Sequence, residues 1–241
     1  MKENFSVIVC AAIALILTAG FSYCQNDHRQ VREQLAKTHP NFAVSEIRET
    51  PIAGVFELEV GPNVLYYHPE KNLLIFGEIW TGEGKSLTAD RRTEIASRKV
   101  RNVPLDKALK VGRGPNKVIE FTDPDCAYCR KLSTFFRGRE DVTRYVFFVP
   151  LAAHKGADQK VRFILCSDNP ERSYEEVMEG KFDGKPMDTC NSETVSDIMK
   201  THRDIGTKTG IQGTPMLWVN NTAVRGANIP IIKGLLTKNN Q

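Results

Sequence analysis

Short apolar and polar runs alternate between residues 42 and 80, with turn residues between them. This spacing is typical of β-strands that bury one face, because successive side chains of a strand point to opposite sides. A helical pattern over residues 28–38 precedes the runs. The strand-like segments are FAVSEI (42–47), GVFELEV (54–60), NVLYYH (63–68) and NLLIFGEI (72–79). Together they predict a small α+β domain over residues 25–86.

A charged stretch with helical periodicity follows, from Ser86 to Val100, with Thr88 as the expected N-cap. It stands between two apolar patterns, and this position predicts a linker helix within residues 87–110.

Beyond the linker, strands and helices take turns along the chain. We expect strands at 117–121 and 143–151, a helix from Cys126, a helical block at 155–209, a strand pair at 213–227 and a final helix from 229. This order predicts a thioredoxin-like fold with a helical insertion over residues 111–241, so the chain as a whole is assigned to the α+β class.

The N-terminus carries an apolar run of eleven residues, Val7–Leu17, followed by small residues. A membrane-spanning helix needs about 20 such residues. The run therefore predicts a signal peptide over residues 1–24 and export of the protein. Removal, retention or lipid modification of Cys24 stays open.

The composition is that of a folded soluble domain, with 41% hydrophobic and 26% charged residues and a net charge of +4. The charge is small and the basic residues stand among acidic ones, as on a solvated helix face. We therefore expect no nucleic-acid partner.

The chain has six cysteines, of which Cys10 and Cys24 fall within the predicted signal peptide. An even number remains, as expected in an oxidising compartment. Four cysteines allow three pairings, and pairing neighbours in sequence needs the least rearrangement of the chain. The four are Cys126, Cys129, Cys166 and Cys190.

Two of them form a CxxC motif in FTDPDCAYCRKL (121–132). Haem attachment requires His directly after the second cysteine, where this chain has Arg130. A zinc ribbon needs a second close pair, whereas Cys166 and Cys190 are 24 positions apart. Elimination favours a redox-active dithiol that needs no metal or cofactor.

A cysteine at the start of a helix is close to unpaired backbone N–H groups, which stabilise an anion. Cys126 is therefore the expected attacking thiolate. Cys129, one turn later, is placed to resolve a mixed disulfide formed by Cys126.

Acidic residues surround the motif. Glu120, on the incoming strand, either points beneath the CxxC and exchanges a proton with Cys129, or faces solvent at a strand edge. Asp123 and Asp125 are expected turn residues, and His154 lies in an expected surface loop without an assigned role.

A second motif, Gly213–Thr214–Pro215, stands directly before a strand. A cis peptide bond before Pro215 would expose backbone N–H and C=O groups to an extended peptide, but an ordinary trans turn fits equally well. Thr214 and Pro215, with Tyr128 between the two thiols, are the predicted substrate-binding residues. Tyr128 is also placed to tune the redox potential.

Three segments in order, VIEFTDPDCAYCRKL, ILCSDN…MDTC and GIQGTPMLWVN, resemble the catalytic domain of the bacterial thiol:disulfide interchange proteins DsbC and DsbG. The stretch PIAGVFELEVGPNVLYYHPEKNLLIFGEIW is similar to the amino-terminal dimerisation domain of the same family. The resemblance covers nearly all of the chain after the predicted signal peptide.

The resemblance implies a periplasmic homodimer that rearranges wrong disulfides in exported proteins and is kept reduced by a membrane thiol reductant of the DsbD type. It implies that Cys126 is the nucleophile and Cys129 the resolving thiol. Cys166 and Cys190 match the family's structural disulfide, and Thr214–Pro215 match its cis-proline loop.

Two departures bear on redox direction. The dipeptide between the thiols is Ala-Tyr where isomerases usually have Gly-Tyr, and Glu120 is acidic where they often have an apolar residue, as in the oxidase branch of the superfamily. They favour, as an alternative, a DsbA-like dithiol oxidase. A separate, third interpretation is a DsbG-like periplasmic chaperone with secondary redox activity.

Overall fold

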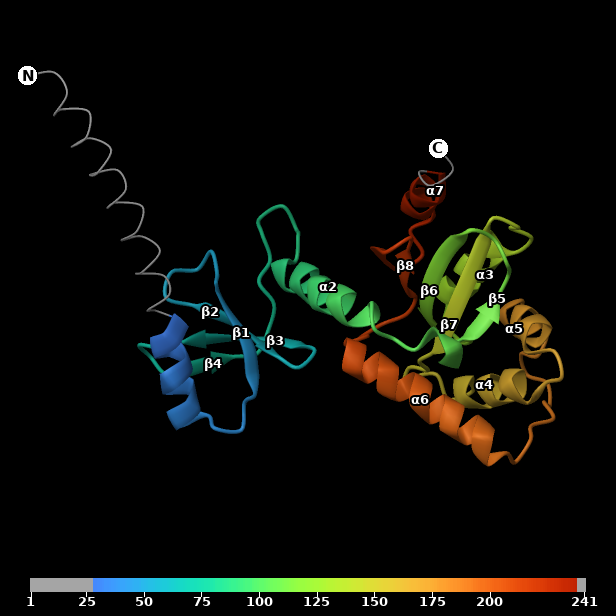
Figure 1. The fold of residues 1–241 in the computed structure, drawn as a ribbon, viewed down its shortest axis with the longest axis horizontal. Coiled ribbons are helices and arrows are strands. Elements are labelled where there is room, and N and C mark those ends of the chain that lie inside the picture. Colours follow the sequence, from blue (N-terminus) through green and yellow to red (C-terminus); the bar gives the residue numbers. More distant parts are fainter. Residues whose placement is uncertain (1–27, 238–241) are drawn as a thin grey trace, which may run out of the picture. The chain divides into compact units, whose positions relative to one another are not determined.

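The computed structural model of the chain describes residues 28–237. The predicted signal peptide, residues 1–24, lies outside these residues. Two compact units make up the chain, and the division between them follows Ala89 (Figure 1). Over the described residues, no helix combines the length and hydropathy that crossing a bilayer requires.

The first unit is an antiparallel sheet with a helix, residues 28–38, packed on it. Its strands pair in chain order: β1 (Val44–Glu49), β2 (Phe56–Val60), β3 (Asn63–His68) and β4 (Leu73–Ile75). Val31 and Leu35 of the helix share a buried cluster with Leu58 and Tyr67 of the sheet. The predicted α+β architecture is confirmed.

Helix α2 (Leu87–Val100) begins with a different cap from the expected one. The N–H of Ala89 donates to Oγ of Ser86 at 3.0 Å, so Ser86 is the N-cap. The prediction of Thr88 was wrong because Thr88 is fully buried and its hydroxyl bonds that of Tyr66. Two neighbouring hydroxyl residues are equally good caps in sequence, and tertiary packing decides between them.

The second unit is built on a five-stranded mixed sheet in which β6 and β7 are parallel and the other pairs antiparallel. The order across the sheet is β5 (Leu109–Val111), β7 (Val142–Phe148), β6 (Asn116–Thr122), β8 (Met216–Val219), β9 (Thr222–Arg225). Its helical elements are η1 (Leu105–Lys107, 3₁₀), α3 (Ala127–Phe136), α4 (Ala157–Cys166), α5 (Pro170–Met178), α6 (Glu193–Thr209) and α7 (Ile229–Thr237).

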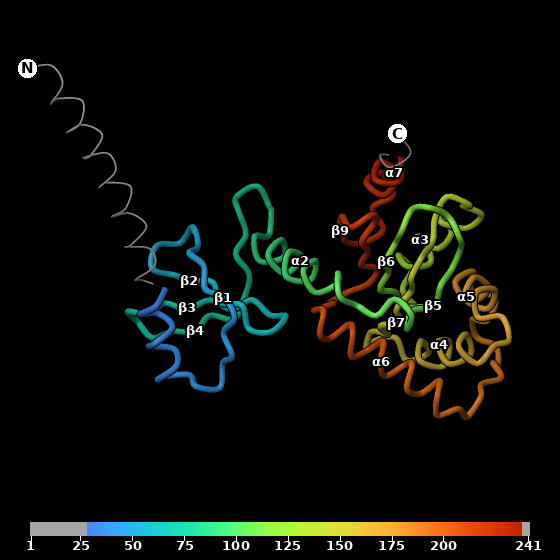
Figure 2. The backbone as a smooth tube through the Cα atoms, viewed as in Figure 1, coloured from blue at the N-terminus to red at the C-terminus, as the bar shows by residue number. Residues whose placement is uncertain are grey.

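Helices cover both faces of this sheet. Residues of α3 and α7 pack with Val118 and Leu217 on one face, and residues of α2 and α6 pack with Phe121 and Trp218 on the other. Helix α4 packs against α5 and α6, as the trace in Figure 2 shows. The indole N–H of Trp218 donates to Oγ of Ser97 at 2.9 Å, so the end of α2 belongs to the core of this unit.

Candidate active site

Strand β6 leads into the short loop that carries Cys126. The strand ends at Thr122 and α3 begins at Ala127, so Cys126 is the N-cap residue of α3. Its N–H donates to the carbonyl of Asp123 at 3.1 Å, which closes a tight turn. Cys126 is only 7% exposed, and both it and Cys129 are free thiols.

Cys129 lies one turn further along α3 and is fully buried. Burial raises the pKa of the Cys129 thiol, and hydrogen bonds from the hydroxyls of Thr122 and Thr214 act against this rise. Each of these hydroxyls is buried and finds no other hydrogen-bond partner in the part of the chain that is described. Both are therefore available to donate to a thiolate that forms at Cys129.

The loop before β8 lies against the first thiol. The Thr214–Pro215 peptide bond is cis. The carbonyl oxygen of Thr214 is 3.4 Å from Sγ of Cys126 and accepts its hydrogen bond. Tyr128, on the first turn of α3, is 67% exposed. The structure thus brings Cys126 and Thr214 together although they are 88 positions apart in sequence. The aromatic ring of Tyr128 lies at the surface.

Cys166 and Cys190, the other two cysteines among residues 28–237, form a disulfide bond. Cys166 is the last residue of α4, and Cys190 lies in the segment between α5 and α6. The N–H of Cys190 donates to Sγ of Cys166 at 3.0 Å. This bond ties the end of α4 to the start of α6 within the helical insertion.

Glu120 is fully buried on β6, so the interpretation that it faces solvent was wrong. Strand β6 is the central strand of the sheet. Because β7 and β8 flank it, it has no exposed edge. Glu120 accepts a hydrogen bond from Nε of Arg144 at 3.0 Å and one from the hydroxyl of Tyr174 at 3.4 Å. Burial alone would lower the pKa of Arg144, but the carboxylate of Glu120 raises it, so the guanidinium is charged. Neither of these hydrogen bonds reaches Cys129.

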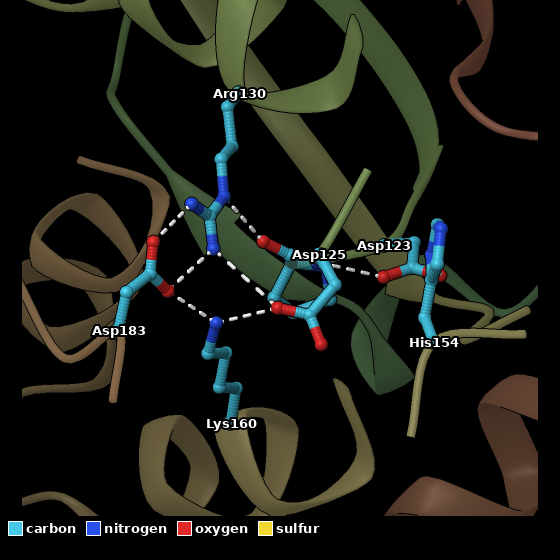
Figure 3. Close-up of polar contacts among 7 residues, drawn as sticks. Asp123, Asp125, Arg130, His154, Lys160 and Asp183 are labelled. Carbon is cyan, nitrogen blue, oxygen red and sulfur yellow. Dashed lines mark hydrogen bonds and ion pairs between the residues drawn. The ribbon is translucent and has the colours of Figure 1, made fainter. Parts of the chain in front are cut away.

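The structure contains a network of ion pairs next to the CxxC loop that the sequence pattern does not predict. Asp123 behaves as the expected turn residue, since its Oδ1 accepts the N–H of Asp125 at 2.8 Å. Its Oδ2, however, also contacts Nδ1 of His154 at 2.8 Å, which gives that loop residue a partner. Asp125 in turn contacts Arg130 and Lys160 (Figure 3). These residues have no shared periodicity, and only the fold brings them together.

Comparisons with known proteins match both units of the chain to described families. The family described as "Disulfide bond isomerase protein N-terminal domain" matches residues 22–89, and "Thioredoxin-like domain" matches residues 104–240. The chain belongs to the DsbC family of thioredoxin-like thiol:disulfide interchange proteins. As a member of this family it is a thiol:disulfide interchange enzyme, and the predicted fold is confirmed.

Curated relatives match the sequence of this chain along most of their length. The probable thiol:disulfide interchange protein DsbC of Bordetella avium is 26% identical over 87% of this chain and 74% of its own. DsbC of Escherichia coli K12 is 26% identical over 95% of this chain and 93% of its own. A crystal structure of a disulfide interchange protein from Neisseria gonorrhoeae is 31% identical, covers 58% of this chain and 99% of that one, and has a TM-score of 0.49.

Proposed function

We propose that this enzyme is an exported, periplasmic protein disulfide isomerase and reductase whose reactive thiol is Cys126. One observation carries the proposal: Sγ of Cys126 stands at a helix start, 3.4 Å from the backbone carbonyl of Thr214, while Cys129 is buried behind it. Cys126 is placed to attack a substrate disulfide, and Cys129 is placed to resolve the mixed disulfide that results.

The reaction begins when the thiolate of Cys126 attacks one sulfur of a substrate disulfide. A mixed disulfide forms, and the other substrate sulfur leaves as a thiolate. In isomerisation, a second substrate thiolate attacks the mixed disulfide, forms the new substrate disulfide and releases Cys126 as a thiolate. No net oxidation occurs.

In reduction, Cys129 attacks Sγ of Cys126 instead. The substrate leaves as a dithiol and the Cys126–Cys129 disulfide remains. Two electrons must then come from an external dithiol, for which we propose a membrane reductant of the DsbD type. The hydroxyls of Thr122 and Thr214 support this step, because they can donate to the thiolate of Cys129 before it attacks.

Substrate binding is proposed for Tyr128 and the Thr214–Pro215 loop. The exposed ring of Tyr128 offers an apolar surface with a polar tip. Pro215 has no N–H, so an extended peptide at this loop would bond to the backbone of its neighbours. We propose that Cys166–Cys190 is structural, since it lies within the insertion and joins the end of α4 to the segment before α6.

A role for Glu120 in proton exchange with Cys129 stays a prediction. Its support is position: Glu120 and Thr122 are two residues apart on β6, so their side chains share the face that carries α3. Since Arg144 holds the carboxylate, such exchange would need an intervening group.

A homodimer is proposed through the first unit. Strand β4 is at the edge of its sheet, and apolar side chains on and after it are exposed: Leu73 by 56%, Ile75 by 43% and Phe76 by 68%. An exposed apolar edge strand pairs readily with another strand. A second copy of this edge would bury these side chains and give each substrate two reactive thiols.

The Ile75→Lys variant tests the dimer, because a charged edge residue opposes strand pairing. We expect a monomer that still reduces small disulfides but has lost most isomerase activity. Ile52→Lys is the matched control, since Ile52 is similarly exposed but lies in the β1–β2 loop. A monomeric wild-type chain, or a monomeric variant with full isomerase activity, would overturn this architecture.

Refolding of a scrambled multi-disulfide protein tests the function itself. The wild-type enzyme should restore native disulfides in the presence of a thiol reductant, and Cys126→Ser should not. Oxidation of a reduced substrate, assayed in parallel, should be slower. Faster oxidation would favour the DsbA-like oxidase, and rescue of the substrate by Cys126→Ser would favour the chaperone.

A further inference from the structure

Two cations and two carboxylates form a closed network beside the CxxC loop. Arg130 donates from Nη2 to Oδ1 of Asp183 at 2.8 Å, and its Nη1 contacts the other oxygen. Lys160 contacts both Asp183 and Asp125. Figure 3 shows Arg130 and Lys160 approaching from opposite sides, with Asp125 and Asp183 between them.

The network is joined directly to the reactive cysteine. Arg130 follows Cys129 in α3, and its N–H donates to the carbonyl of Cys126 at 3.1 Å. Its Nε donates to the carbonyl of Pro124 at 2.7 Å, and Asp125 is the residue before Cys126. The guanidinium of Arg130 therefore lies at the loop that holds the thiol.

Asp183 comes from a different part of the fold. It lies between α5 and α6, in the segment of the helical insertion that also carries Cys190. The guanidinium of Arg130 holds the pKa of Asp183 well below its usual range, with further help from Lys160, so the carboxylate is charged. Asp183 thus neutralises cations that would otherwise act on the CxxC loop.

We infer that Asp183 sets the redox equilibrium of the Cys126–Cys129 pair by neutralising Arg130 and Lys160. This inference rests on the proposed role of Cys126 as the exchanging thiol. The reduced site carries negative charge whenever Cys126 is a thiolate, and the disulfide carries none. Positive charge nearby favours the reduced form, and a carboxylate that cancels it favours the disulfide. Asp183 is a positioning residue that tunes the site from the insertion.

The charges predict opposite effects for two substitutions. Asp183→Asn removes a carboxylate and leaves Arg130 and Lys160 with Asp125, so the local charge becomes more positive and the reduced form gains. Lys160→Gln removes a cation and has the opposite effect. Asp188→Asn is the matched control, because Asp188 is exposed in the same segment and takes no part in the network.

The experiment measures the equilibrium of the full chain with glutathione. Two glutathione thiols give two electrons to the Cys126–Cys129 disulfide, which yields the dithiol and glutathione disulfide. Asp183→Asn should raise the equilibrium constant for this reduction about three- to tenfold, or roughly 15 to 30 mV. Lys160→Gln should lower it by a similar factor. The shift caused by Asp183→Asn should shrink at high salt, because the side chain of Asp183 is 44% exposed.

Three results would overturn the inference. Asp183→Asn could match Asp188→Asn, which would show that the carboxylate has no effect on the equilibrium. Asp183→Asn and Lys160→Gln could shift it in the same direction, as a loss of loop structure would. The wild-type enzyme could show no two-electron equilibrium involving Cys126, in which case the proposed function fails as well.

Discussion

The buried ion pair between Glu120 and Arg144 should be costly to break from one side. Replacing Arg144 by Met leaves the carboxylate of Glu120, which is fully buried, without its cation. Removing one partner of such a pair typically costs about 3–5 kcal/mol. Arg144 is also packed between aromatic rings, with Cζ 5.0 Å from the centroid of Phe136 and 5.1 Å from that of Tyr174. Met keeps part of this packing, so the unpaired charge should account for most of the change. We expect Arg144→Met to lower the free energy of unfolding by about 3–5 kcal/mol.

A double variant separates the charge from the packing. Glu120→Leu together with Arg144→Met removes both ions and leaves the hydroxyl of Tyr174 without these two partners, at a cost of about 1–3 kcal/mol. Glu175, which also contacts Arg144, keeps its ion pair with Arg137. The double variant should therefore be more stable than Arg144→Met alone. Arg139→Met is the control: Arg139 pairs with Asp141 at 2.7 Å but is 30% exposed. Its loss should cost no more than about 1 kcal/mol.

Urea unfolding followed by tryptophan fluorescence measures these differences. Trp218 is buried in the second unit and reports its unfolding, whereas Trp80 is exposed in the first. A Trp80→Phe background leaves a single reporter. The reasoning is refuted if Arg144→Met costs less than about 1 kcal/mol, or if the double variant is no more stable than Arg144→Met.

Three further predictions concern the cysteines and His202. Alkylation of the reduced enzyme should label Cys126 before Cys129, which is fully buried; the reverse order, read by mass spectrometry, would exchange their roles. Replacing Cys166 and Cys190 by Ala should lower the free energy of unfolding by about 3 kcal/mol, because the bond closes a loop over 24 positions; mild dithiol should reduce Cys126–Cys129 and spare this bond, and simultaneous reduction would contradict a structural role. Burial lowers the pKa of His202, and the hydrogen bond of its ring to a backbone carbonyl opposes this only in part. As the pH decreases below about 6.5, the unfolded chain therefore takes up the proton before the folded chain does, and the free energy of unfolding decreases. His202→Gln should reduce this decrease, measured by urea titrations at pH 7.5 and 5. A slope unchanged by that substitution would show that other groups cause it.

Local patterns were sufficient to predict most of the fold. Alternation at 42–79 gave the four strands, and the apolar run at 117–121 followed by Cys126 gave a strand that enters a helix. These signals are contained in a few neighbouring residues. The spacing of the CxxC also placed one cysteine at the helix start and one on its first turn.

What the sequence could not supply depends on residues far apart in the chain. Glu120 contacts Arg144 because β6 and β7 are neighbours in the sheet, and nothing in the sequence of either strand predicts that pairing. The contact between Arg130 and Asp183 spans 53 positions and needs the insertion to fold back onto α3. The cap at Ser86 differs from the expected one by two positions, because burial of the neighbouring hydroxyl decides between them.

The roles of the two active-site thiols are tested most directly by trapping the mixed disulfide. A Cys129→Ala enzyme, mixed with a disulfide-bonded protein, cannot resolve the intermediate and should accumulate it. Peptide mapping by mass spectrometry should then find the substrate joined to Cys126. A substrate joined to another cysteine, or the absence of any covalent complex while the wild-type enzyme remains active, would contradict Cys126 as the nucleophile.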